Sequence, residues 1–504
     1  MKTPFLYSCL LGTFMATAQP SVTVFENYID KNGARILSDF TSLLSIPNVA
    51  ADLPNINKNA AYIQDELEKR GVQTKQLRMI GTPPIIFGYL PTKGATRTLA
   101  FYVHYDGQPV NKDNWVHEPW EPVLYNKAMT LGGKPIAMPK AGEPIDPEWR
   151  LYARSAGDDK APILSILTAL DAIRENKLTL TSNIVFFFEG QEEAGSVQLR
   201  NYLEDNHELI DQIDLWMFCD GPVHQTRQPQ LVFGVRGSTG MEVTVFGPSR
   251  PLHSGHYGNW APVPGQMLAS LVASMKDENG NVLIEGYYDD VEPLTVRELE
   301  ALANVPEVDT QLREELGLAD TEGNEPLYKR LLYPSLTIRG LSSGNVGDLT
   351  RNVIPSTATV SLGMRMVKGC DPEQMQEKVE KHIEKQGFHI VREIPDHDTR
   401  MKYPKIALVE RENGYPAART SMDDPFALQV VKRTRDVAGD QLVLLPTLGG
   451  SLPLYLFTDV LKKPAIIVPI ANHDNNQHAE NENLRIANLW YGIKLMGALM
   501  TMEK

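Results

Sequence analysis

Two patterns of hydrophobic and polar positions alternate along the chain. In the first half, short apolar runs at residues 98–103, 183–188 and 213–219 are separated by stretches with helical periodicity at residues 161–173 and 195–206. Nearly continuous apolar runs are typical of strands buried on both faces of a parallel sheet, because helices cover those faces. The pattern therefore predicts an α/β fold with a mainly parallel central sheet flanked by helices.

The pattern changes at about residue 240. Residues 241–247 and 358–367 alternate apolar and polar positions, as half-buried antiparallel strands do. Residues 371–387 form an amphipathic helical pattern that ends at a glycine. This block, residues 240–398, predicts a separate and smaller α+β domain.

After about residue 403 the first pattern returns, with a helix predicted at residues 425–439 and a closing helix predicted from Glu482. Apolar strands are predicted between these two helices. The simplest arrangement is a small domain inserted into a larger one. The larger domain would then consist of residues 19–239 and 399–504, and the inserted domain of residues 240–398.

The first 18 residues have the pattern of a secretory signal peptide. Lys2 is followed by an apolar run and by an Ala-Thr-Ala sequence, with a cleavage point after Ala18. A disordered N-terminus is the alternative. No later window reaches the ~18 apolar residues of a membrane-spanning helix, and Cys219 and Cys370 are too few for a disulfide framework. We therefore expect an exported, soluble protein, periplasmic or secreted, with no membrane span.

The amino-acid composition limits the kinds of molecule that the protein is expected to bind. The chain has 504 residues, of which 42% are hydrophobic and 22% are charged, as in ordinary soluble globular proteins. The formal net charge of -14 argues against a nucleic-acid binder, which would present a basic face. We therefore expect a small-molecule or peptide substrate and no nucleic-acid partner.

Acidic residues and histidines gather where the predicted strands end. These residues are His104, Asp106, Asp158, Asp159, Glu192, Glu193, Asp220 and His478. Because ligands bind at the carboxyl ends of the strands in an open parallel sheet, we expect these side chains to share one crevice. So many acids would repel one another and take up protons unless cations lay among them. Two divalent ions would offset the charge, and mixed histidine and carboxylate ligands suit Zn²⁺ or, at a harder site, Mn²⁺.

The motifs His-x-Asp, Asp-Asp-Lys, Glu-Glu-x-Gly, a strand-end Asp and a late His follow one another in this order. The chain resembles, over essentially all residues after the first 18, the di-zinc metallopeptidases that include carnosinase-type dipeptidases, glutamate carboxypeptidases, aminoacylase and succinyl-diaminopimelate desuccinylase. The stretches HYDGQP, NWVHEPWEP and EGQEEAGS are most similar to the carnosinase-like dipeptidase branch. One departure is Ala161, where the family usually has Gly after the Asp-Asp-Lys triplet.

The resemblance implies which residues hold the metal ions. Asp158 would bridge two ions, His104 and Asp220 would complete one site, and Glu193 and His478 would complete the other. The ions would be Zn²⁺, with Mn²⁺ or Co²⁺ as alternatives.

The resemblance also implies how the neighbouring residues act. Asp106 would orient the imidazole of His104, and the peptide bond between Asp158 and Asp159 would be cis. Glu192 would be the general base that takes a proton from the metal-activated water and passes it to the leaving amine.

In the inserted domain, the resemblance implies a lid that also forms a homodimer. His253 would stabilise the oxyanion, typically from the partner subunit, with action within one chain as the alternative. Asn352 and Arg365 would bind substrate, and Arg365 would grip its terminal carboxylate. Gly450 and Ser451 would donate hydrogen bonds to the same carboxylate.

The sequence therefore predicts an exported di-metal peptidase that hydrolyses dipeptides or short peptides with a free C-terminal carboxylate. An N-acyl amino acid amidohydrolase with the same site is the alternative. A non-catalytic metal- or peptide-binding protein would lack a ligand or the base, and none is missing. A Ser-His-Asp hydrolase lacks support because the chain has no Gly-x-Ser-x-Gly elbow after a strand.

Overall fold

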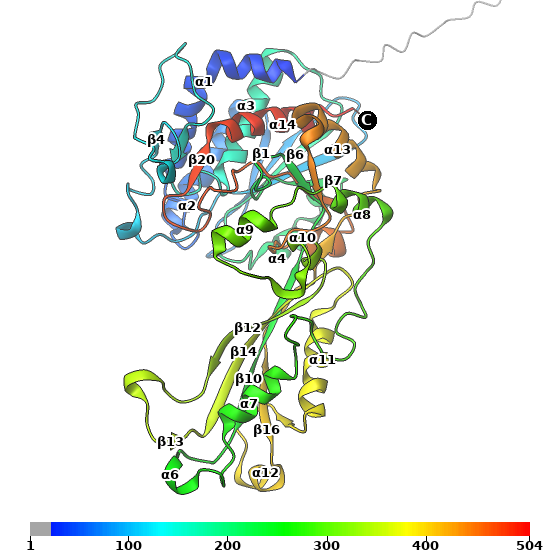
Figure 1. Cartoon of the computed structure of the whole chain (residues 1–504). Helices are drawn as coiled ribbons and strands as arrows, with labels where there is room; N and C mark the ends of the chain where they lie inside the picture. The colour runs from blue at the N-terminus through cyan, green and yellow to red at the C-terminus, as the bar shows by residue number, and fades with distance from the viewer. Residues whose placement is uncertain (1–21, 504) are drawn as a thin grey trace, which may run out of the picture.

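The structure is a computed structural model that describes residues 22–503. The signal peptide expected at residues 1–18 lies outside the described residues. The chain forms an upper lobe around an eight-stranded sheet and a narrow lower lobe around a five-stranded sheet (Figure 1). The lower lobe is formed by residues from the middle of the sequence, and the C-terminal residues return to the upper lobe.

The eight-stranded sheet is parallel at its centre. In spatial order its strands are β1 (Gln73–Leu77), β2 (Ile85–Leu90), β6 (Asn183–Glu189), β3 (Thr98–His104), β7 (Leu215–Phe218), β19 (Ala465–Ile467), β8 (Gln230–Val232) and β18 (Val443–Leu445). Strands β6, β3, β7 and β19 pair in parallel, and β1 and β2 add an antiparallel edge. The prediction of a mainly parallel central sheet is confirmed.

Helices cover both faces of this sheet. One face packs against α1 (Thr23–Leu44), α2 (Leu53–Lys69), α3 (Lys160–Glu175), α13 (Pro425–Ala438) and α14 (Ile486–Met500). The other face packs against α4 (Leu199–Asp205), α5 (His207–Ile210) and the π-helix η6 (Leu456–Val460). Phe101 and Tyr102, neighbours on β3, enter opposite cores, which explains the unbroken apolar run. Among residues 22–503, no helix has both the length and the apolarity to cross a membrane.

The five-stranded sheet forms the lower lobe. In spatial order its strands are β12 (Ser335–Ser342), β14 (Thr357–Met366), β10 (Gly237–Phe246), β16 (Ile406–Arg411) and β15 (His389–Val391). Only β15 and β16 pair in parallel. The buried positions of β14 alternate with half-buried or exposed ones, as predicted, because α7 (Pro264–Ala273) and α11 (Pro372–Lys385) cover one face. The domain boundaries expected at residues 240 and 398 stay a prediction.

Short elements complete the fold. The small sheets are formed by β4 (Val123–Tyr125), β5 (Arg150–Tyr152) and β20 (Asn483–Arg485), by β9 (Gly234–Val235) and β17 (Ala418–Arg419), and by β11 (Leu252–His253) and β13 (Val353–Ile354). The remaining α-helices are α6 (Ser254–Tyr257), α8 (Val296–Ala303), α9 (Asp309–Leu316), α10 (Leu327–Arg330) and α12 (His397–Lys402).

Two predicted helices begin later than expected. The closing helix begins at Ile486 rather than at Glu482, because residues 483–485 pair with β5 as a strand. Helix α4 begins at Leu199 rather than at residue 195, because Gly195 and Ser196 have positive φ angles of 88° and 49°. Local periodicity does not reveal a pairing with residues more than 300 positions away.

Candidate metal centre

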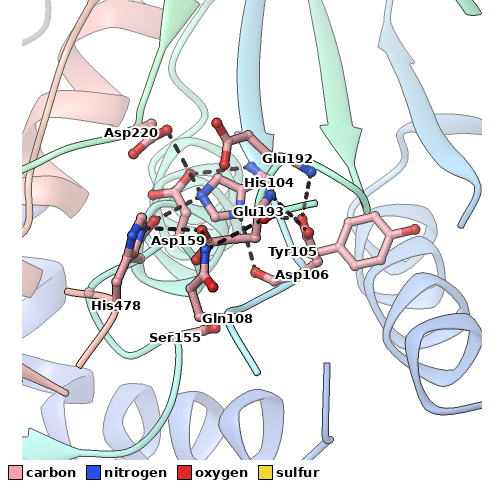
Figure 2. A network of polar contacts seen from close by, with 12 residues as sticks. His104, Tyr105, Asp106, Gln108, Ser155, Asp159, Glu192, Glu193, Asp220 and His478 are labelled. Carbon is pink, nitrogen blue, oxygen red and sulfur yellow. Dashed lines mark hydrogen bonds and ion pairs between the residues drawn. The ribbon is translucent and has the colours of Figure 1, made fainter. Parts of the chain in front are cut away.

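The predicted acidic crevice is present at the carboxyl end of the parallel strands. His104 ends β3, Glu192 and Glu193 follow β6, and Asp220 follows β7. Asp158 lies just before α3, and His478 lies in the loop after β19. Figure 2 shows the labelled side chains converging from these separate elements. The cause is topological, because parallel strands end at the same edge of a sheet.

Two groups of possible ligand atoms share Asp158. The atoms of His104, Asp158 and Asp220 lie within 4.8 Å of one another, and so do those of Asp158, Glu193 and His478. His104 Nε2 is 2.8 Å from Asp158 Oδ1 and 3.9 Å from Asp220 Oδ2. His478 Nε2 is 3.1 Å from both Asp158 Oδ2 and Glu193 Oε2. Each oxygen of the Asp158 carboxylate therefore faces a different histidine.

The protonation equilibria indicate a surplus of negative charge in the crevice. Burial, together with the charge of Asp158, raises the pKa of Asp220 to about 7. Burial raises the pKa of Glu192 well above its usual value, and the charge of Asp220 adds to this effect. Hydrogen bonds to Asp158 and Glu193 raise the pKa of His478 to about 10. Added positive charge would stabilise every carboxylate in the group.

The donor set fits two divalent metal ions. Asp158 Oδ2 is buried, and among the described residues it accepts no hydrogen bond of normal geometry although His478 faces it. Two imidazoles and three carboxylates are the donors that Zn²⁺ and Mn²⁺ accept in proteins. These five residues could therefore hold two ions that share Asp158.

Asp106 connects the loops that carry the possible ligands and the expected base. Its Oδ1 and Oδ2 accept hydrogen bonds from the backbone amides of Glu192 (3.1 Å) and Glu193 (3.0 Å). His104 Nδ1 lies 3.5 Å from Asp106 Oδ1 and 3.2 Å from its backbone oxygen. Asp106 therefore contacts Nδ1 of His104 and also fixes the backbone after β6.

Sequence reasoning missed two residues beside the ligands. Gln108 Nε2 donates a 2.8 Å hydrogen bond to Glu193 Oε2. Glu482 is buried and accepts hydrogen bonds from the backbone that leads to Asp158. Each is close in sequence to a recognised motif: Gln108 comes two residues after Asp106, and Glu482 comes four residues after His478. Closeness in sequence to these motifs was the signal by which both residues could have been found.

The backbone at the Asp-Asp-Lys triplet has the conformation that the resemblance implies. The peptide bond between Asp158 and Asp159 is cis, as the resemblance implied. The departure at Ala161 is accommodated, because this residue is fully buried in the first turn of α3. It removes no possible ligand.

Three of the expected substrate-binding residues lie together. Arg365, near the end of β14, donates a 2.6 Å hydrogen bond from Nη1 to Ser451 Oγ. Ser451 Oγ in turn lies 2.7 Å from the backbone oxygen of Arg236, whose backbone amide donates to Gly450 O at 3.2 Å. Arg236, which sequence reasoning did not single out, therefore contacts both residues of the 450–451 loop through its backbone.

The fourth expected substrate-binding residue, Asn352, and the expected oxyanion-stabilising His253 lie elsewhere. His253 directly precedes α6, and the backbone oxygen of Asn352 accepts a 3.0 Å hydrogen bond from the Ser254 amide. Helix α6 lies at the far end of the lower lobe from the eight-stranded sheet (Figure 1). Within one chain, His253 and Asn352 are therefore brought together with each other and not with the possible metal ligands.

Comparison with known proteins identifies the family. The model of peptidase family M20/M25/M40 matches residues 100–502. The chain belongs to this family. It is therefore a metallopeptidase, and the predicted enzyme class is confirmed.

Individual relatives agree with the family. The chain is 26% identical over 486 residues to a Cys-Gly metallodipeptidase of Schizosaccharomyces pombe, covering 93% of this chain and 95% of that protein. It is 28% identical over 458 residues to the Beta-Ala-His dipeptidase of Homo sapiens, covering 87% and 83%. A solved M20 family metallo-carboxypeptidase from Sulfolobus solfataricus matches with a TM-score of 0.73 at 26% identity, over 93% of this chain and 98% of that one. The predicted fold class and the carnosinase-like branch are confirmed.

The predicted location is wrong. We expected an exported protein, periplasmic or secreted, but the Cys-Gly dipeptidases of yeast that resemble this chain are cytosolic, and nothing in the comparisons indicates a signal peptide. An apolar run followed by small residues is only a compositional pattern, and it does not by itself establish export.

Proposed function

We propose that this M20 metallopeptidase hydrolyses dipeptides or short peptides that have a free C-terminal carboxylate. The observation that carries the proposal is the pair of ligand groups that share Asp158, with Glu192 beside them and outside both groups. The similar proteins named as Cys-Gly and Beta-Ala-His dipeptidases support the same substrate class.

In this proposal five residues hold the metal ions. His104, Asp158 and Asp220 would hold one ion, and Asp158, Glu193 and His478 would hold the other. Bound ions, which we expect to be Zn²⁺, would supply Lewis-acid chemistry at the scissile carbonyl and at the attacking water.

Glu192 is the proposed general base. Burial and the charge of Asp220 raise its pKa, which favours the protonated form and so prepares the carboxyl group to accept a proton. Glu192 takes the proton of the attacking water and delivers it to the nitrogen of the leaving amine. Asp106 fixes the Glu192 backbone, so the base is presented from a defined position.

Binding of the substrate's free carboxylate is assigned to Arg365 and the 450–451 loop. The Arg365 guanidinium has no acidic partner among residues 22–503, so it is available for a charge-assisted pair. We propose further that the lower lobe is a lid that forms a homodimer, and that His253 and Asn352 reach the substrate of the partner subunit. The distance of α6 from the eight-stranded sheet supports this arrangement.

The substitution Glu192→Gln tests the proposal. We expect the kcat for dipeptides to fall by about 10²–10⁴-fold, because the amide cannot accept the proton, while the bound metal content stays the same. Steady-state kinetics and elemental analysis measure the two quantities. Glu208→Gln, an exposed glutamate on α5, is the matched control and should leave both unchanged.

The substrate class is tested by a hydrolysis screen of dipeptides against N-acyl amino acids, with and without added metal. Hydrolysis of dipeptides that disappears on chelation supports the proposal. Hydrolysis of N-acyl amino acids alone would show instead that the same site serves an amidohydrolase.

A further inference from the structure

A cavity of about 380 Å³ extends from Glu192 to Ser451. Its walls come from three segments that are distant in sequence: residues 195–201 around the start of α4, Tyr415 after β16, and residues 451–456 before and within η6. The proposed base and a proposed carboxylate-binding residue therefore line the same cavity.

The position of the cavity identifies the part of a substrate that it would receive. In a dipeptide, the nitrogen that Glu192 protonates and the carboxylate that Arg365 and Ser451 bind belong to the same residue and are separated by one Cα atom. The side chain on that Cα projects from between the nitrogen and the carboxylate, and the cavity lies at this position. This step rests on the proposed function.

Aromatic and apolar side chains form one part of the cavity wall, beside the polar Ser196, Asn201 and Ser451. The rings of Tyr415 and Tyr455 are nearly parallel, with an interplanar angle of 14° and centroids 6.0 Å apart. Val197, which is 66% exposed, and Leu452 add apolar surface. An aromatic side chain placed here would bury a large apolar area and contact π-systems in favourable geometries.

Arg200, the one cationic residue among residues 22–503 that lines the cavity, does not favour a substrate with an acidic C-terminal residue. Arg200 lies over the Tyr455 ring, 5.9 Å from its centroid, and its side chain is 47% exposed. Within the described part of the chain its ion pair is with Glu204, at 3.6 Å. A carboxylate that approached this guanidinium would gain only a solvent-screened interaction.

We propose that this cavity binds the side chain of the C-terminal residue of the substrate and that the enzyme selects an aromatic residue there over glycine. A C-terminal glycine would leave the apolar walls in contact with water, so its transition state would lose the burial that an aromatic ring provides. The proposal assigns Tyr415, Tyr455 and Val197 as specificity-determining residues.

The test compares kcat/KM of the metal-loaded enzyme for Ala-Phe, Ala-Asp and Ala-Gly. We expect Ala-Phe to exceed Ala-Gly by at least about tenfold, the usual range for filling an apolar pocket. Tyr455→Ala should lower the Ala-Phe to Ala-Gly ratio by about tenfold, and Tyr455→Phe should keep it because the ring remains. Tyr62→Ala, on α2 away from the cavity lining, is the control and should keep the ratio.

A second variant keeps the test decisive if Tyr455→Ala fails to fold. Val197 is exposed, so we expect the fold to tolerate Val197→Trp. The indole should fill the cavity and lower kcat/KM more for Ala-Phe than for Ala-Gly. Equal or faster cleavage of Ala-Gly or Ala-Asp by the wild type, or ratios unchanged by Tyr455→Ala and Val197→Trp, would overturn the proposal. Absence of any dipeptide hydrolysis would contradict the proposed function instead.

Discussion

Glu482 fixes the backbone next to the residue that both ligand groups share. Its Oε1 accepts hydrogen bonds from the amides of Gly157 and Asp158, both at 2.9 Å. Its Oε2 accepts hydrogen bonds from the amide of Ser155 at 2.8 Å and from Arg154 Nη1 at 2.9 Å. Four donors satisfy both oxygens of a buried carboxylate. We infer that Glu482 is a positioning residue for Asp158.

We predict that Glu482→Gln weakens metal binding by about 10- to 100-fold, as loss of a supporting partner behind a ligand does. The amide has only one oxygen, and its NH₂ group would meet backbone N–H donors without an acceptor. Titration with Zn²⁺ against a competing chelator measures the affinity. The matched control is Glu480→Gln, on the same loop but exposed, for which we expect no change. An unchanged affinity in Glu482→Gln would show that the loop holds its shape without this carboxylate.

At the scale of elements, the lower lobe depends on an ion-pair cluster that joins α11 to the sheet. Glu380 of α11 accepts two hydrogen bonds from Arg392, which follows β15, and two from Arg411 at the end of β16, all at 2.7–2.8 Å. Burial alone would raise the pKa of Glu380, but these hydrogen bonds outweigh it and lower the pKa to about 2. The charged carboxylate therefore stabilises the folded state.

The lowered pKa of Glu380 predicts a pH dependence of stability. A carboxyl group with a lower pKa in the folded state contributes stability above its unfolded value of about 4.5, and this contribution is lost as the pH falls towards about 2. We expect Glu380→Gln to lower the free energy of unfolding by about 1–2 kcal/mol at pH 7, after allowance for solvent screening of the arginines. The difference from the wild type should shrink below about pH 4.

Urea denaturation at several pH values measures this difference. Glu384→Gln, exposed on the same helix, is the control and should match the wild type at every pH. A constant difference between Glu380→Gln and the wild type across the acid range would mean that packing, rather than charge, explains the effect.

At the scale of the whole molecule, the proposed catalytic groups of one chain lie at opposite ends of the folded molecule, one set in each lobe. The possible metal ligands lie in the upper lobe, and α6, which follows His253, lies at the far end of the lower lobe (Figure 1). If His253 acts on the substrate of a partner, each active site combines residues from two copies.

This arrangement predicts complementation between two inactive variants. His253→Ala and Glu192→Gln, each inactive alone, should regain about a quarter of wild-type activity when co-expressed. Half of the dimers would be mixed, and each mixed dimer would contain one intact site. Activity of the co-purified mixture measures the effect, and two copies of the same variant serve as the control. No recovery in a mixture shown to contain mixed dimers would mean that His253 does not act across subunits.

The sequence by itself was sufficient to predict the α/β class and the residues of the acidic crevice. His104 ends β3 and Asp220 follows β7 by two residues, so their positions follow from strand topology, and the ordered motifs pointed to the family. Local patterns are enough here, because consecutive parallel strands bring their ends to one edge whatever the rest of the chain does.

Only the tertiary structure decided which distant residues support and complete that crevice. Glu482 contacts backbone more than 300 residues earlier in the chain, and the rings of Tyr415 and Tyr455 stack although they are 40 positions apart in the sequence. The start of the closing helix was misplaced for the same reason, since the pairing of β20 with β5 is also long-range. Such contacts depend on how the elements pack together, and this information is absent from any short window of sequence.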